Sequence, residues 1–299
     1  MALKKVLFIV NQKAGQNNRI NLQECFVGKE GEYECHIHLL KKDPLKEIEK
    51  AIAQFQPEII AAAGGDGTIN LVARLIRNTG IKLLIIPMGS ANGMAKEFDM
   101  PESLEGCIKL IETGRTVAID LLKINQEISI HLADVGLNAK IVKRFQLDKK
   151  RGMLTYAKYL FNEVFFIKKR TFMLYMENET RKIKAVSITF ANATKYGTGA
   201  VINPDGKLND GLFEICIVKP FPKVHLLSIA IKMFRNRLKY SEYFETIHCT
   251  KAKLIAMSST LLQVDGEVIG RVKEINMECL PGAVQMIIPG GSDYPTLIN

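Results

Sequence analysis

A glycine-rich segment at residues 64–68, with the sequence GGDGT, carries the residue types and spacing best suited to chemistry. Glycines let backbone N–H groups approach a ligand closely because they carry no Cβ. The segment follows an apolar run, Ile59–Ala63, and precedes a helical pattern, whose N-terminus would add N–H groups and a positive dipole end. These features predict a cradle for phosphate groups. Asp66 would repel a bare anion there, but it could hold Mg²⁺, a water on Mg²⁺ or a reacting hydroxyl.

Two further loops of this kind follow neighbouring strand patterns. Asn11–Gly15 (NQKAG) follows the apolar run Lys5–Val10, and Pro87–Gly93 (PMGSANG) follows the run Leu83–Ile86. Open α/β sheets bind ligands beyond the carboxyl ends of their strands, so three loops at one edge predict a nucleotide site. The loops match neither a Walker A motif, whose Lys is absent, nor the GxGxxG dinucleotide fingerprint.

The elements that must position these loops alternate between strand and helix in the first third of the chain. Short apolar strands separated by helical patterns indicate a parallel, three-layer α/β sheet. From Thr116 onward the runs lengthen and alternate, as at 186–190, which is typical of half-buried antiparallel strands. We predict an N-terminal α/β nucleotide-binding domain at 1–118 and a C-terminal β-sandwich domain at 119–283. A last strand within 284–299 would pack back on the first domain.

Composition narrows the class of protein. The chain has 299 residues, a net charge of +10 and six cysteines without a CxxC pair. The charge favours an anionic partner, although no basic and aromatic interleaving typical of nucleic-acid modules occurs, so we expect no nucleic-acid partner. No apolar run approaches the ~18 residues of a transmembrane helix. We therefore expect a cytoplasmic protein with free thiols that meets any lipid at the bilayer surface.

In its order of motifs, the chain resembles the diacylglycerol kinase catalytic family, which includes bacterial lipid kinases and sphingoid-base kinases. GGDGT alone is shared with the NAD kinases, so the second half decides. The segments that resemble family motifs are Asp134–Ala139, Ala191–Gly199, Asn203–Leu212 and Val264–Glu267. The resemblance covers nearly the whole chain and implies a lipid-substrate domain after the nucleotide-binding domain, with the active site in the cleft between them.

The resemblance implies a kinase that uses ATP and Mg²⁺ to phosphorylate a lipid hydroxyl, of diacylglycerol or a related lipid such as a sphingoid base, in phospholipid biosynthesis. Glu267 would be the general base, with Asp66 as a rival. The residues that would bind ATP are Asn11, Gly15, Gly64, Gly65, Asp66, Gly67, Thr68, Asn70, Ser90 and Asn92. A structural Mg²⁺ would be held by Lys207, Asp210 and Leu212, the outer two through backbone carbonyls, and Asp120 would join an acidic network with Asp66 and Asp210.

Several positions depart from the family pattern. Gly93 follows Asn92 where bacterial diacylglycerol kinases usually carry Asp, which is more like the sphingoid-base branch. The first loop reads NQKAG instead of NPxSG, and Leu40 stands where a Thr is frequent. These departures concern nucleotide preference and lipid identity, and they leave the phosphate cradle and Glu267 in place.

Several alternatives stay open from the residues. The chain could be a kinase of a soluble substrate, like the NAD kinases, or a non-catalytic nucleotide- or lipid-binding protein. The apolar helix pattern at Met153–Phe166 fits either core packing or a wall of the lipid cleft. The basic clusters 149–151 and 168–170 fit either solvated faces or lipid headgroup contacts. The family also suggests a homodimer.

Overall fold

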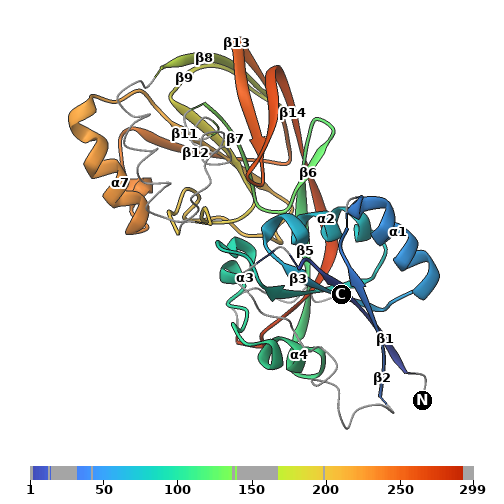
Figure 1. Ribbon diagram of the computed structural model, residues 1–299. Coiled ribbons are helices and arrows are strands. Elements are labelled where there is room, and N and C mark those ends of the chain that lie inside the picture. The colour runs from blue at the N-terminus through green and yellow to red at the C-terminus, as the bar shows by residue number, and fades with distance from the viewer. Residues whose placement is uncertain are drawn as a thin grey trace. The chain divides into compact units, whose positions relative to one another are not determined.

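The structure, a computed structural model, describes residues 3–12, 14, 32–41, 43–136, 139, 168–197 and 199–291 (Figure 1). Contacts divide the chain into two units. Unit 1 comprises residues 1–119 and 282–299, and unit 2 comprises residues 120–281. The chain passes from unit 1 to unit 2 within β5 (Arg115–Ile124) and returns within β14 (Glu267–Ile288).

Unit 1 is built on a parallel sheet. Its strands are β1 (Lys4–Val10), β2 (Tyr33–Leu39), β3 (Ile59–Gly64) and β4 (Lys82–Pro87). Their order is β4-β3-β1-β2, and the end of β14 joins beside β4, where Gln285 pairs with Lys82. Every residue of β3 is buried, as its continuous apolar sequence requires of a strand covered on both faces. Gly64 ends this strand, so the strand delivers GGDGT to the edge of the sheet.

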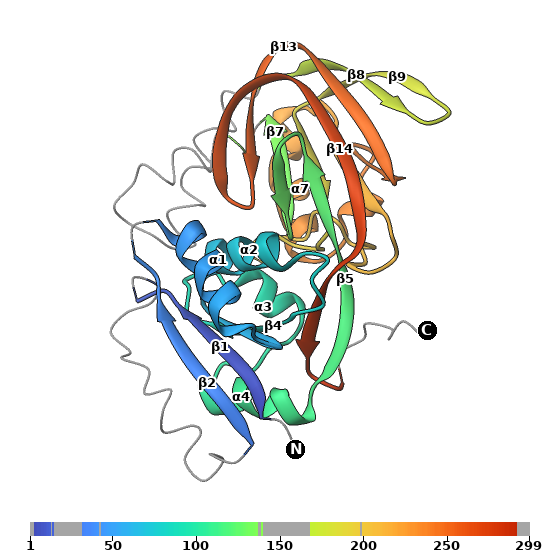
Figure 2. The same cartoon turned by 90° about the vertical axis from the view of Figure 1, so that its right-hand side faces the viewer.

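Helices cover this sheet and carry the loops. They are α1 (Pro44–Phe55), α2 (Asp66–Ile76), α3 (Gly93–Glu97) and α4 (Leu104–Thr113). Figure 2 shows α1 and α2 side by side, and α2 packs on β3 through a stripe that includes Ile69, Val72 and Ile76. The helix α4 starts at Ser103, whose hydroxyl accepts the N–H of Gly106, and it packs against β4 together with α3.

Unit 2 is an antiparallel β-sandwich. Its strands are β6 (Glu127–Ser129), β7 (Leu132–Gly136), β8 (Arg170–Met176), β9 (Thr180–Ala185), β10 (Ser187–Ala191), β11 (Phe213–Val218), β12 (Phe244–Cys249) and β13 (Lys251–Val264). The order β12-β11-β10-β7-β13-β14 forms one path, and β8 joins β13 at its other half. A register shift in β13 between Ile255 and Thr260 separates the half that pairs β8 from the half that pairs β7. The core between these strands is aromatic and aliphatic, with Phe172, Phe190 and Phe213 fully buried.

A second, smaller core lies under the helical part of unit 2. This part consists of the 3₁₀ turns η2 (Lys223–His225) and η3 (Leu238–Tyr240) and the helix α7 (Leu226–Phe234) between them. Ile229 and Leu238 are buried there beside Phe244 of β12. The helical pattern at 224–234 therefore packs on the sandwich through one of its faces only.

The predicted fold class, an α/β domain followed by a β-sandwich domain, is confirmed. The strands were harder to delimit than to detect. The runs 261–264 and 284–288 are the ends of β13 and β14, which are 14 and 22 residues long. Their other halves carry charged residues on the outward face, such as Lys251 and Lys253, and these hide the apolar pattern. The predicted helix at 153–166 and the cluster 149–151 lie outside the described residues.

Candidate active site

The GGDGT loop of unit 1 folds back on its own threonine. A Cβ at Gly64 would stand 2.4 Å from Thr68 Oγ1 and 2.6 Å from Thr68 Cβ, so only glycine leaves room for the Thr68 side chain. Thr68 in turn accepts a hydrogen bond from Asn11 Nδ2 at 3.2 Å. Asn11 is thereby tied to the cradle, and two of the three predicted loops of unit 1 meet. Gly15, the far end of the first loop, lies outside the described residues.

The loop Pro87–Gly93 contacts the GGDGT loop backbone to backbone. A Cβ at Gly89 would lie 2.6 Å from the Cα of Gly65, and one at Gly65 would lie 3.2 Å from the Cα of Gly89. Asn92, in the left-handed conformation with a φ of 51°, accepts the Gly89 N–H through its Oδ1 at 2.7 Å. The contact requires glycine at 89, and at 65 a side chain would be tight. The sequence pattern included Gly65 as a ligand contact and did not identify Gly89 as its packing partner.

Asp66 holds the second loop in place. Its Oδ2 accepts the N–H of Gly93 at 3.0 Å, and its Oδ1 accepts the N–H of Met94 at 3.1 Å. The carboxylate therefore caps the first turn of α3, where free N–H groups and the helix dipole favour a negative charge. Both of its oxygens are engaged within unit 1.

Gly67 differs from Gly64 and Gly65 because no contact within the fold requires a glycine at this position. It is exposed in the first turn of α2, no heavy atom lies within 4 Å of the Cβ it lacks, and its φ is not in the left-handed region. Glycine costs roughly 0.5–1 kcal/mol relative to alanine inside a helix. A glycine here is understandable if something outside the chain must approach the backbone at this point.

The remaining predicted nucleotide contacts lie around this loop system or close to it in sequence. Asn70, one turn further along α2, has a buried Oδ1 that accepts no hydrogen bond from the described residues. Ser90 is exposed in the second loop. Asn70 thus offers a buried oxygen without a partner among the described residues, close to Gly67, which the fold does not require. The first turns of α2 are therefore the part of unit 1 that fits a ligand with hydrogen-bond donors.

In unit 2, the turn before Glu267 is a two-residue hairpin. Asp265 and Gly266 have φ angles of 47° and 83°, and Val264 pairs directly with Glu267 across the turn. Positive φ at both central positions is the geometry that Asp-Gly favours between strands. The structure therefore places Asp265 and Gly266 in the turn itself. Glu267 is thus the first residue of β14.

The Asp265 carboxylate anchors this hairpin to the chain before β7. It accepts hydrogen bonds from Ser129 Oγ at 2.6 Å and from the backbone N–H groups of Ile130, His131 and Leu132 at 2.9–3.2 Å. Burial raises the pKa of Asp265, whereas His131 and these hydrogen bonds act in the opposite direction. Asp265 is therefore a positioning residue for the turn.

A second buried connection supports the same hairpin. Gln263 donates from Nε2 to Asp134 Oδ2 at 2.5 Å and accepts the Gly266 N–H through Oε1 at 2.7 Å. Asp134 and Gln263 are both fully or almost fully buried. The resemblance included Asp134 without giving it a role, and Gln263 was missed. The available signal was a polar residue at an inward position of an otherwise apolar strand end.

Glu267 itself stands apart from these contacts. It is exposed, and its carboxylate has no hydrogen bond or ion pair with any residue that the structure describes. A rigid turn thus presents one carboxylate without a partner, and such a group can accept a proton from an incoming hydroxyl.

The predicted metal segment folds around Asp120. Asp120 accepts the Gly211 N–H at 2.7 Å and donates its own N–H to Leu208 O at 2.6 Å, while Asp210 accepts the Leu212 N–H at 3.1 Å. Lys207 is exposed in the same turn. Asp66, the third predicted member of the acidic network, belongs to unit 1.

A buried carboxylate that the sequence reasoning missed adds to this region. Glu214 of β11 is buried and accepts Asn203 Nδ2 at 2.6 Å, and His248 Nδ1 lies 3.0 Å from its other oxygen. Burial raises the pKa of Glu214, and the charge of Asp210 raises it further, against the effect of these two partners. Burial and the charges of Asp120, Asp210 and Glu214 raise the pKa of Cys279 to about 12. Negative charge therefore accumulates here. An acidic residue in the strand sequence FEICIV was the signal for it.

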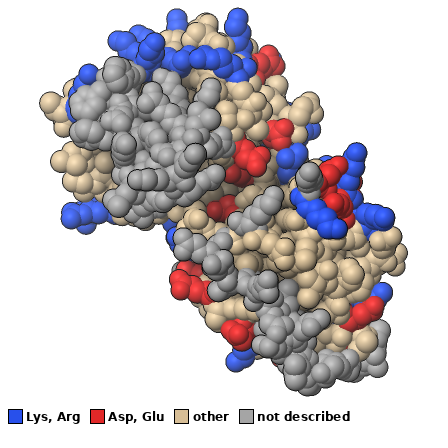
Figure 3. Space-filling view, viewed as in Figure 1, with Lys and Arg blue, Asp and Glu red and all other residues tan. Residues whose placement is uncertain are grey.

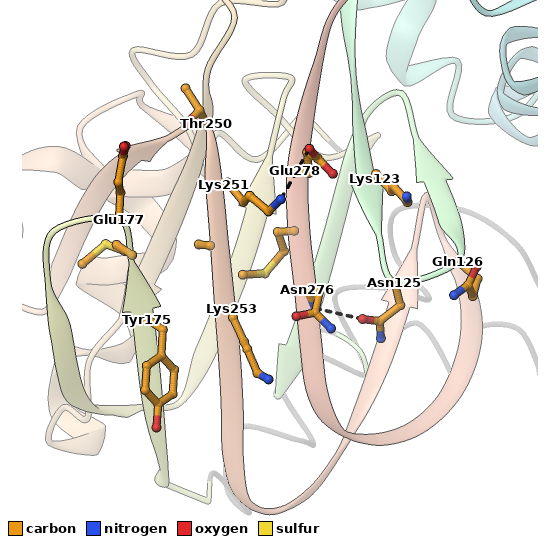
Figure 4. A pocket seen from close by; sticks show the side chains of 13 residues that line it. Lys123, Asn125, Gln126, Tyr175, Glu177, Thr250, Lys251, Lys253, Asn276 and Glu278 are labelled. Atoms are coloured by element: carbon orange, nitrogen blue, oxygen red, sulfur yellow. Dashed lines mark hydrogen bonds and ion pairs between the residues drawn. The ribbon is translucent and has the colours of Figure 1, made fainter.

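Unit 2 also has a hollow of about 920 Å³, shown in Figure 4. Lys251 pairs with Glu278 at 3.7 Å and Lys253 with Glu274 at 2.7 Å, so the charges around it are balanced. None of the predicted site residues lines this hollow. The volume of this hollow therefore gives no reason to place the chemistry there.

Among the described residues, no helix is both long and apolar enough to cross a bilayer. In the same part of the chain no group of three or more His, Cys, Asp or Glu side chains forms a candidate metal cluster.

Two protein-family models match nearly the whole chain. Residues 5–124 match the model of the diacylglycerol kinase catalytic domain, and residues 132–288 match that of the YegS C-terminal NAD kinase β-sandwich-like domain. A probable lipid kinase YegS-like of Klebsiella pneumoniae is 27% identical over 299 residues, which are 97% of each chain. A probable lipid kinase YegS of Salmonella arizonae is 27% identical over 303 residues, with the same shares.

A solved structure agrees on the fold. A diacylglycerol kinase from Bacillus anthracis superposes with a TM-score of 0.75 at 19% identity, and the match covers 98% of this chain and 99% of that one. The suggested resemblance and the prediction of a kinase are both confirmed, because the two family models together cover both units. The chain belongs to the diacylglycerol kinase catalytic-domain family of lipid kinases.

Proposed function

We propose that this protein transfers the γ-phosphoryl group of ATP to the hydroxyl of a lipid, diacylglycerol or a related lipid such as a sphingoid base, in a Mg²⁺-dependent reaction. Family membership supports the reaction class. The observation that carries the proposal is Gly67, a glycine in a helical turn that neither packing nor backbone conformation requires. A phosphate group approaching the N-terminus of α2 gives this glycine its reason.

The nucleotide side of the site is the loop system of unit 1. Backbone N–H groups around Gly65–Gly67 would bind phosphate oxygens, whereas the Thr68 N–H already donates to Gly65 O at 2.9 Å. Asn70 Oδ1, which has no partner among the described residues, would accept from a ligand hydroxyl or amino group. Asn11, Ser90 and Asn92 would border the nucleotide. Phosphoryl transfer depends mostly on positioning and charge neutralisation, so a rigid backbone cradle suits it.

The acceptor side is the hairpin of unit 2. In the proposed step Glu267 takes the proton of the lipid hydroxyl as the hydroxyl oxygen bonds to the γ-phosphorus. The bond from that phosphorus to the β–γ bridging oxygen breaks, and ADP leaves with the electron pair. Glu267 is exposed and unpartnered among the described residues, whereas both oxygens of Asp66 already accept N–H groups. This contrast favours Glu267 as the base and Asp66 as a positioning residue.

The segment at Lys207–Leu212 has donors that fit a hard cation. Carboxylate and carbonyl oxygens are what Mg²⁺ prefers, and Asp120, Asp210 and Glu214 concentrate negative charge there. We propose that the backbone carbonyls of Lys207 and Leu212 and the carboxylate of Asp210 hold it. Bound Mg²⁺ would neutralise negative charge at this turn. The residues of the turn, through the Asp120 hydrogen bond to Gly211, keep the loop in shape.

We further propose that the protein works in the cytoplasm and meets its lipid acceptor at the surface of a bilayer. The test is transfer of labelled phosphate from ATP, with Mg²⁺, to diacylglycerol, monoacylglycerol, sphingoid bases and phosphatidylglycerol, with NAD as a further acceptor. We expect label in at least one lipid and none in NADP. Label in NADP alone, or in no acceptor with the fold intact, would overturn the proposal.

A further inference from the structure

The helix α7 of unit 2 is apolar on two faces. Ile229 and Met233 face the smaller core. On another face, Val224, Leu227, Ile231 and Phe234 keep 84%, 71%, 43% and 55% of their surface exposed. Their spacing of three, four and three residues places them on one side of the helical segment. We call these four residues the α7 stripe.

Such a stripe needs an explanation because a helix that is apolar all round is normally buried or in lipid. Isolated exposed apolar residues are common, but a contiguous set usually marks an interaction surface. With nine residues, α7 is far too short to span a bilayer. An exposed apolar face is one feature of a helix that lies in an interface.

The charged residues of the segment that carries the α7 stripe have one sign. Between Lys219 and Ser241 the sequence has six Lys or Arg residues and no Asp or Glu. Two of the six are paired, Lys219 with Glu245 and Lys239 with Asp205. The other four have no ion pair with the residues that the structure describes, and they are Lys223, Lys232, Arg235 and Arg237. In Figure 3 the flank that carries α7 in Figure 1 shows tan and blue without red.

From this combination we infer that the α7 stripe docks unit 2 on an anionic bilayer surface. The apolar side chains enter the boundary between headgroups and acyl chains, and the four basic side chains meet anionic headgroups. A second copy of the chain fits less well because two such surfaces would bring like charges together. The inference rests on the proposed function for its purpose, since a lipid acceptor is reached from a bilayer, but docking itself requires no turnover.

The experiment is sedimentation of the full chain with vesicles of phosphatidylcholine, with or without phosphatidylserine, in the absence of ATP. We expect binding only to the anionic vesicles, weakened by salt. The double variant Leu227→Asp/Phe234→Asp should bind at least about tenfold more weakly, because two apolar side chains no longer enter the boundary. Each of Arg235→Gln and Arg237→Gln should weaken binding about fivefold. The altered side chains are exposed, so the melting temperature should not change.

The matched control is Met257→Asp. Met257 is also an exposed apolar residue of unit 2, at 58%, but it lies in β13 next to Ser258, which accepts a hydrogen bond from Arg170 of the 168–170 cluster. We expect this variant to bind vesicles like the wild type. Equal loss of binding in the control, full binding by the α7 variant, or no wild-type binding to anionic vesicles would overturn the inference.

Two further measurements separate membrane docking from a dimer interface and from the proposed function. Light scattering should give the same oligomeric state for the wild type and Leu227→Asp/Phe234→Asp; a dimer lost in the variant, with vesicle binding kept, would assign the stripe to a second copy. Transfer to a detergent-dispersed short-chain lipid should be equal in the two proteins. If neither protein transfers phosphate there, the proposed function fails while the vesicle result still stands.

Discussion

The loop system of unit 1 and the hairpin of unit 2 differ in which groups they leave available to a ligand. In unit 1 the glycines leave backbone without side-chain cover, and at Gly67 nothing among the described residues explains the missing side chain. In unit 2 the polar residues around the turn satisfy one another, with Asp265 and Gln263 making six hydrogen bonds, and a single carboxylate, Glu267, remains outside. A bare backbone suits a ligand held by its phosphates, whereas a rigid turn with one free group suits proton transfer.

The largest effect should come from removing the free carboxylate. Glu267→Gln keeps the shape of an exposed side chain, so stability should not change. It removes a general base, for which losses of about 10²- to 10⁴-fold in the maximal rate are typical. Transfer of labelled phosphate at saturating ATP measures this. Asp66→Asn should instead weaken the cap of α3. If an Asp66 variant lost the transfer reaction while the loops kept their structure, Asp66 would be the base instead of Glu267.

The next effect should come from filling the bare position in unit 1. Gly67→Ala should weaken ATP binding by at least about tenfold, since the new methyl group occupies the space that a phosphate needs. The same change should leave stability equal or raise it by roughly 0.5–1 kcal/mol, because alanine favours a helix. Calorimetric titration and thermal unfolding measure the two quantities. Unchanged ATP affinity would show that the glycine has some other reason.

A smaller effect should follow from loosening the hairpin. Asp265→Asn replaces a carboxylate that accepts four hydrogen bonds with an amide that has only one accepting oxygen. We expect a loss of about 1–3 kcal/mol in the free energy of unfolding. The maximal rate should fall more than the apparent affinity for ATP, because the hairpin positions Glu267 and makes no contact with the nucleotide in our proposal. A change in ATP affinity with an unaltered maximal rate would contradict this role.

The smallest effect concerns the buried carboxylate of β11. The pKa of Glu214 is raised in the folded protein, so its contribution favours the folded state below about pH 4.5 and is lost as the pH rises through the raised value. Glu214→Gln keeps the size of the side chain and removes this titration. The variant should therefore gain stability over the wild type as the pH rises from 4 to 8. If the stability difference between the two proteins did not vary with pH, the pKa of Glu214 would not be raised in the folded protein.

Much of the fold could be predicted because its signals are local. The strand β3, for example, is a continuous apolar run that ends in glycines. The partners of these residues could not be predicted, because they lie far away in sequence. Gly65 needs glycine at 89, and Asp265 meets donors more than 130 residues earlier. Asp66 illustrates the limit: its place in the loop suggested chemistry, and only the fold reveals its hydrogen bonds to Gly93 and Met94.

The dependence of lipid phosphorylation on ATP concentration tests the division of labour between the two units most directly. Measured for Gly67→Ala and Glu267→Gln beside the wild type, it separates loss of binding from loss of chemistry. We predict that Gly67→Ala needs more ATP for half-maximal rate and recovers at high ATP. We predict that Glu267→Gln keeps the wild-type half-maximal concentration and stays slow at every concentration. The opposite pattern, or two variants that behave alike, would contradict the account.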